Sequence, residues 1–184
     1  MESWVWIIIA VGVIAAVVLA VFGWQQARRR RLQSSFGPEY QRAVAGAPTR
    51  KEAETALEER RKRRGELDIR PLSQDAAERY GHEWEAIQVR FVDDPVGATR
   101  EADRLVQQVM SDRGYPMDDF DGRAELISVD YPTIVENYRK AHGAYLDYDR
   151  GDASTEDLRQ AMVDYRALFQ ELVGSEEREH EEVR

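Results

Sequence analysis

Residues 4–24, WVWIIIAVGVIAAVVLAVFGW, form one apolar run without a charged residue. As a helix rising about 1.5 Å per residue, the run spans about 30 Å, the thickness of a bilayer's hydrocarbon core. Trp4, Trp6 and Trp24 stand at its two ends, where tryptophan rings favour the headgroup layer. The sequence therefore predicts a single transmembrane anchor over residues 1–27.

A cleaved secretory signal is the alternative interpretation of this N-terminus, but such a signal needs basic residues before a short apolar core. Here Glu2 precedes the run, and the run is too long, so we favour the anchor. Four cations follow it directly: Arg28, Arg29, Arg30 and Arg31. By the positive-inside rule, the N-terminus lies outside the cell membrane and the rest of the chain lies in the cytoplasm.

The anchor also carries small residues at a spacing of four, which places Gly12, Ala16 and Ala20 on one helix face. Small residues let two membrane helices approach closely, so a homodimer through the anchor is a further expectation. Plain contact of these residues with lipid is the alternative, because small residues are common in any anchor.

Charge is distributed unevenly along the 184 residues, whose formal net charge is −9. Residues 28–70 hold thirteen basic and seven acidic residues, a net charge of +6, whereas residues 71–184 have a net charge of −14. The basic part would be attracted to an anionic inner leaflet and the acidic part repelled from it. An acidic distal part argues against a nucleic-acid partner, and the absence of cysteine excludes disulfides and thiol nucleophiles.

Helical periodicity dominates the remaining chain, and no segment alternates as a strand would. We predict a basic juxtamembrane segment with a charged helix over residues 28–72, a helical bundle over 73–174 and an acidic disordered tail over 175–184. The expected fold is all-α: an N-terminal transmembrane helix, then a soluble antiparallel bundle of about four main helices, with short and charged helices at its periphery.

The first bundle helix has the clearest core stripe, with apolar residues at spacings of three and four. Helix limits are indicated by capping residues, which supply oxygen acceptors at the start of a helix or a left-handed glycine at its end. The stripe consists of Ala77, Tyr80, Trp84, Ile87 and Phe91, and the expected caps are Ser73, Asp94, Gly114, Gly151 and Ser154.

A second basic cluster ends the charged helix. It is a solvated helix face neutralised by nearby glutamates, a contact for anionic lipid headgroups, or a nucleic-acid contact; the first is the commoner case. Together with the four arginines after the anchor, its members are the candidate lipid-contact residues: Arg60, Arg61, Lys62, Arg63 and Arg64.

One pocket is conceivable within the bundle, where Tyr138, His142 and Tyr145 share a helix face. Core packing of these aromatic rings is the alternative, because no convergent set of polar groups is visible. Two acidic segments, 119–122 and 147–151, resemble calcium loops but fail the ligand spacing, so we interpret them as turns or helix caps. The sequence thus predicts no metal and no cofactor.

The sequence shows no phosphate-binding glycine loop, serine elbow or paired metal ligands, which disfavours an enzyme without excluding it. We expect a membrane-anchored interaction or scaffold module that binds an unknown protein partner. The alternative is a small-ligand sensor or enzyme with a pocket near His142.

Several stretches together resemble a group of uncharacterised single-pass membrane proteins of high-GC, actinobacterium-like bacteria. The resemblance implies no activity, cofactor or site residue, because no function is assigned to that group. It is carried by FGPEY from Phe36, RPL from Arg70, RYGHEW from Arg79, QVRFVDDP from Gln88, ADRLVQQVM from Ala102, RGYP from Arg113 and TEDLRQAMVDYRALF from Thr155.

Overall fold

The computed structural model describes residues 3–174, and over this range it contains eight helices and no strand. The all-α prediction is therefore confirmed. The chain divides into two compact units after Glu58, within the third helix, and the predicted tail lies outside the described residues. The helices are α1 (Ser3–Phe36), α2 (Pro38–Gly46), α3 (Arg50–Gly65), α4 (Gln74–Arg90), α5 (Pro95–Arg113), α6 (Phe120–Asp130), α7 (Val135–Arg150) and α8 (Thr155–Val173).

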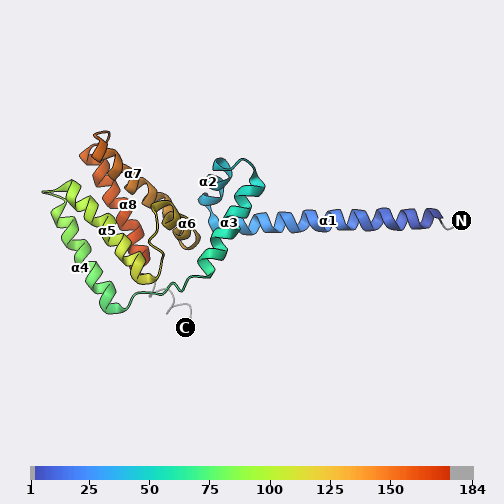
Figure 1. Ribbon diagram of the computed structural model, residues 1–184, viewed down its shortest axis with the longest axis horizontal. Helices are drawn as coiled ribbons and strands as arrows, with labels where there is room; N and C mark the ends of the chain where they lie inside the picture. The colour runs from blue at the N-terminus through green and yellow to red at the C-terminus, as the bar shows by residue number, and fades with distance from the viewer. Residues whose placement is uncertain (1–2, 175–184) are drawn as a thin grey trace. The chain divides into compact units, whose positions relative to one another are not determined.

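In the first unit, α1 is long and apolar enough to cross a membrane (Figure 1). Its segment Val11–Phe36 meets this criterion, and the side chains of its apolar stretch are exposed within the protein.

The base of α1 continues beyond the apolar run and joins a small core of its own. Leu32 and Phe36 are fully buried there, as is Leu57 of α3. Gly37, with a φ of 46°, ends α1 in a left-handed conformation that glycine adopts without strain. Pro38 then begins α2, because its missing N–H needs no partner in a first helical turn.

In the second unit, α4, α5, α8 and α7 lie side by side in that order (Figure 1). Two short connections make α4 and α5, and likewise α7 and α8, antiparallel neighbours. The central pair, α5 and α8, runs in the same direction, because Asp103 lies beside Tyr165 and Arg113 beside Leu172. α6 packs against α7.

The core of this unit is formed mainly by the inner faces of α5, α7 and α8, and α4 covers it from one side. Tyr80, Trp84 and Ile87 of the predicted stripe are buried, and Trp84 stacks on Phe169 with ring centroids 4.9 Å apart. Phe91, expected in the same stripe, is only half-buried, because α4 ends there and its last turn lies at the edge of the core.

The buried side chain of Arg113 joins the ends of several segments in this unit through hydrogen bonds. Arg113, the last residue of α5, donates to the carbonyl of Leu172 at 2.6 Å, to the Tyr131 hydroxyl at 2.9 Å and to the carbonyl of Arg70 at 3.2 Å. Gly114 follows it with a φ of 97°, and a Cβ there would lie 2.6 Å from a backbone oxygen. Only glycine fits both the left-handed turn and this close approach.

Candidate functional site

The centre of the second unit contains a buried polar cluster around Asp103 of α5. Its Oδ1 accepts a hydrogen bond of 2.9 Å from the Tyr165 hydroxyl, and its Oδ2 accepts one of 2.6 Å from Gln107 Nε2. Buried carboxylates need such partners, because an isolated charge in the interior is very costly. The two bonds hold the carboxylate at the interface of α5 and α8.

Two of the three predicted pocket residues lie in this cluster. The His142 Nδ1 atom is 3.6 Å from Asp103 Oδ1, and the imidazole stacks on Phe120 with centroids 3.9 Å apart. Tyr138 is completely buried, and the centroid of its ring lies 4.9 Å from that of the Phe120 ring. The third residue, Tyr145, is half-buried, and its hydroxyl accepts a hydrogen bond of 3.0 Å from the exposed Arg100. Its hydroxyl is thus engaged outside the cluster.

Burial controls the electrostatics of this cluster. It raises the pKa of Tyr165 strongly, and the adjacent Asp103 carboxylate raises it further because it disfavours a second negative charge. Burial also raises the pKa of Tyr138; the neighbouring Arg123 guanidinium lowers it, and the Asp103 carboxylate raises it. Both tyrosines therefore stay neutral and act as hydrogen-bonding groups rather than bases.

Three buried polar atoms of the cluster make no hydrogen bond with any described residue: the Tyr138 hydroxyl, His142 Nδ1 and Arg123 Nε. Such atoms are uncommon in folded proteins and often mark a place where a small polar molecule binds. The histidine and its neighbouring Asp103 have the pairing that a general base needs. However, Tyr138 and Tyr165 have no exposed surface, so the helices must separate before a substrate can reach them.

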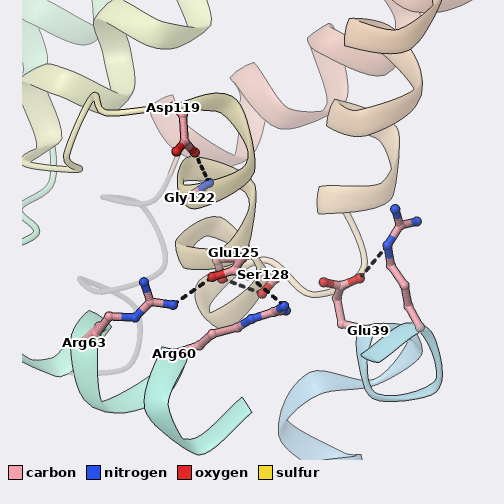
Figure 2. A network of polar contacts seen from close by, with 8 residues as sticks. Glu39, Arg60, Arg63, Asp119, Gly122, Glu125 and Ser128 are labelled. Atoms are coloured by element: carbon pink, nitrogen blue, oxygen red, sulfur yellow. Dashed lines mark hydrogen bonds and ion pairs between the residues drawn. The ribbon is translucent and has the colours of Figure 1, made fainter. Parts of the chain in front are cut away.

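The predicted basic cluster at the end of α3 is largely engaged with α6 (Figure 2). Arg60 and Arg63 donate from Nη2 to the two oxygens of Glu125, at 3.0 Å and 2.7 Å. Arg64 donates from Nε to Asp130 at 2.5 Å. Residues three or four apart share a helix face. The three-residue spacing of Arg60 and Arg63 therefore indicated in the sequence that both could contact one partner.

Figure 2 also shows how α6 presents that carboxylate. Asp119 caps the helix by accepting a hydrogen bond of 2.6 Å from the Gly122 N–H, and Ser128 donates to the carbonyl of Glu125 at 2.6 Å. The interpretation of this acidic segment as a helix cap is thereby confirmed.

Two members of the α3 cluster, Arg61 and Lys62, are exposed on the other side of the helix. Among the four arginines after the anchor, Arg28 pairs with Glu58 at 2.5 Å and Arg29 is half-buried, whereas Arg30 and Arg31 are exposed. These four exposed cations are the members of the predicted lipid-contact set with the greatest freedom to reach a membrane surface. Lipid contact itself stays a prediction.

Two grooves on the surface of the second unit were not predicted from the sequence. One, of about 300 Å³, lies between α4 and α5, where Arg90 and Glu101 form an ion pair. The other, of about 180 Å³, lies between α4 and α8 and has mainly apolar walls. A signal existed on α8: Arg159, Val163 and Arg166 recur at spacings of four and three, outside the predicted core stripe.

Among residues 3–174, no three acidic or histidine side chains are grouped so that they could hold a metal ion. Comparison of the chain with protein-family models, with curated proteins and with solved structures finds no match. The resemblance to single-pass bacterial membrane proteins therefore stays a prediction, and function must be argued from the molecule itself.

Proposed function

We propose that this protein is a membrane-anchored helical scaffold that binds a protein partner at the cytoplasmic face of a cell membrane. The exposed apolar surface of α1 is the observation that supports this most strongly. The soluble helices then remain beside the bilayer, where they present surface grooves to other proteins.

The orientation follows from charge. Arg28, Arg29, Arg30 and Arg31 stand at the C-terminal side of the apolar run, and cations flanking a span are retained in the cytoplasm. The net charge of −14 over residues 71–184 favours a bundle that points away from an anionic leaflet.

Binding rather than catalysis fits the interior of the bundle. Asp103 is held by Tyr165 and Gln107, and the cations Arg60, Arg63 and Arg113 are engaged in contacts that join helices. Groups fixed in this way stabilise the fold and are not available to a substrate. The accessible features of the second unit are its grooves.

Orientation can be tested because the natural chain contains no cysteine. Val92, which is 82% exposed in the turn after α4, would be replaced by cysteine in cells that express the full chain. A membrane-impermeant maleimide should label this residue in inverted vesicles and not in intact spheroplasts. Labelling in intact spheroplasts would show that the domain is exported.

Partner binding can be tested with a photo-crosslinking amino acid placed singly at Val92, Arg104 and Val163, all of which are exposed. A scaffold should yield a covalent adduct with another protein from at least one position. The absence of an adduct at all three positions, with the chain intact in the membrane, would contradict the scaffold proposal.

A second candidate is a small-ligand sensor in the bundle, favoured by the three buried polar atoms at and near His142 that make no hydrogen bond within residues 3–174. A metabolite that stabilises the full chain in a thermal-shift screen should lose this effect in His142→Ala. A screen whose hits stabilise the variant equally would remove this candidate.

A further inference from the structure

The groove between α4 and α8, which we call the socket, has room for about one large side chain. Trp84 and Met162 are buried at its inner side, and Val163, 49% exposed, lies at its mouth. Beside it, Trp84 and Phe169 stack and hold the two helices together.

Its size limits what it accepts. A volume of about 180 Å³ is close to that of an apolar protein cavity of about 150 Å³ that binds a benzene molecule. One leucine or phenylalanine side chain would fill it. Burying such a side chain is worth about 1.5–3 kcal/mol, which is enough to anchor a peptide but not to bind it alone.

Two exposed cations flank the socket on α8. Arg159 and Arg166 are seven residues apart, about 10 Å along the helix axis, and Val163 lies between them. Arg159 pairs with the exposed Glu156, whereas Arg166 makes no ion pair or hydrogen bond with any residue in the described range 3–174. The socket thus lies between two positive charges, of which Arg166 has no partner among residues 3–174.

We propose that the α4–α8 groove is the docking site for an acidic amphipathic helix of the partner protein, an inference that rests on the scaffold function proposed above. One large apolar side chain of that helix enters the socket. Carboxylates three or four residues before and after it pair with Arg159 and Arg166.

The larger groove between α4 and α5 is less suited to this role. Two carboxylates, Glu83 and Glu101, line it, and Glu101 already pairs with Arg90, so an acidic ligand would meet like charges there. The residues that line the α4–α8 groove include no acidic one. The acidic character of the whole unit does not prevent docking at α8, because charges beyond about 10 Å are largely screened at moderate salt. The affinity for an acidic helix therefore depends mainly on the ion pairs formed at the groove itself.

The test uses a fluorescein-labelled, 15-residue helical peptide with one central leucine and glutamates three residues before and four residues after it. Its affinity for the full chain in nanodiscs would be measured by fluorescence anisotropy. We expect at least tenfold weaker binding when the leucine is alanine or when the glutamates are lysines. A wild-type chain that does not bind the acidic peptide, or binds the lysine peptide equally, overturns the proposal.

A matched pair of variants locates the binding. Arg166→Glu should weaken binding at least tenfold, whereas Arg104→Glu makes the same charge change at the α4–α5 groove and should alter it less than twofold. Equal effects of the two substitutions would mean that the peptide responds only to overall charge, which contradicts the proposal.

The indole group provides a direct readout. In a nitrogen–proton correlation spectrum of the full chain, the Trp84 Nε1–H peak, assigned by its loss in Trp84→Phe, should move when the peptide is added. An unmoved peak at saturation would exclude the groove as the binding site.

Failure of the docking site and failure of the scaffold function give different crosslinking results. An adduct from Val163 but not from Arg104 supports docking at this groove. An adduct from Arg104 or Val92 alone leaves the scaffold function and removes this docking site. No adduct at any of the three positions contradicts both.

Discussion

The Tyr165 hydroxyl of α8 donates a 2.9 Å hydrogen bond to Asp103 Oδ1 of α5, and both side chains are buried. This bond joins residues 62 positions apart in the sequence and links the two central helices of the second unit. It gives a buried carboxylate one of its two hydrogen-bond donors. Stability is therefore expected to depend on it.

Replacing Tyr165 by phenylalanine should lower the free energy of unfolding by about 1.5–3 kcal/mol, the usual worth of a hydrogen bond to a charged group. Urea unfolding of the full chain in detergent micelles, followed by circular dichroism, measures this. Tyr145→Phe is the matched control, because it removes a half-buried hydroxyl bonded to an exposed arginine. Equal losses of unfolding free energy in the two variants would show that the buried hydrogen bond stabilises the fold no more than the half-buried one.

Alkaline pH should destabilise the second unit. Burial raises the pKa of Tyr165 and Tyr115 above the value of about 10 found in unfolded chains, and a neighbouring carboxylate adds to each shift. The folded state then keeps protons that the unfolded state loses, so stability is constant below about pH 10 and falls above it. The expected slope is up to about 1.4 kcal/mol per pH unit for each tyrosine.

The check on this pH effect is urea unfolding of the wild type and of Tyr165→Phe between pH 8 and pH 11. The variant should be less stable at pH 8 but should lose stability less steeply above pH 10. Parallel curves would mean that Tyr165 does not titrate in the way that its burial requires.

Arg113→Met should destabilise the second unit by about 3 kcal/mol, because the Leu172 carbonyl and the Tyr131 hydroxyl each lose a charged donor. Methionine keeps the apolar bulk, so the loss reports the hydrogen bonds. Arg104→Met is the control on the same helix, since its side chain is exposed and its change should stay within about 0.5 kcal/mol. Thermal or urea unfolding that does not separate the two variants would refute the role of this cation.

The two faces of the α3 cluster should respond differently to neutralisation. Changing Arg60 and Arg63 to glutamine removes both partners of Glu125, so the amide protons of α6 should exchange faster with solvent. Changing Arg61 and Lys62 should leave α6 exchange unaltered. Hydrogen exchange of the full chain in nanodiscs, read by mass spectrometry, resolves these segments.

Lipid contact is tested in the same measurement by comparing nanodiscs of neutral and of anionic lipid. If Arg61 and Lys62 contact headgroups, anionic lipid should slow exchange at the end of α3, and their neutralisation should abolish the difference. If hydrogen exchange does not depend on lipid charge even at low salt, Arg61 and Lys62 belong to a solvated helix face and do not contact lipid.

Helix limits were predictable because capping is a local interaction. Ser73 accepts from the backbone of Ala76, and Asp94 accepts from that of Gly97. Ser154 forms a reciprocal pair with Asp157. Each of these bonds joins residues three apart, so their letters alone indicate where a helix begins. The left-handed glycines at the ends of α5 and α7 are equally local.

The polar cluster and the docking groove were not predictable in the same way. Asp103 follows Ala102 in a helix whose charged residues mostly face solvent. No neighbouring residue in the sequence distinguishes Asp103 from these exposed charged residues. Its burial depends on how α5 is rotated against α8. Trp84 likewise has the spacing of an ordinary core residue, and its place in the wall of the α4–α8 groove depends on how those two helices pack.

The long apolar helix, the helical class and the helix limits could be predicted from sequence, because hydropathy, periodicity and caps act over a few residues. Which charges are paired, which polar atoms are buried and where a groove opens became known from the packing of the helices. Those outcomes depend on side chains tens of residues apart meeting at helix interfaces. Arg63 and Arg166 are both exposed arginines on helices, yet Arg63 binds Glu125, whereas Arg166 lies beside an apolar groove and has no partner within the described part of the chain.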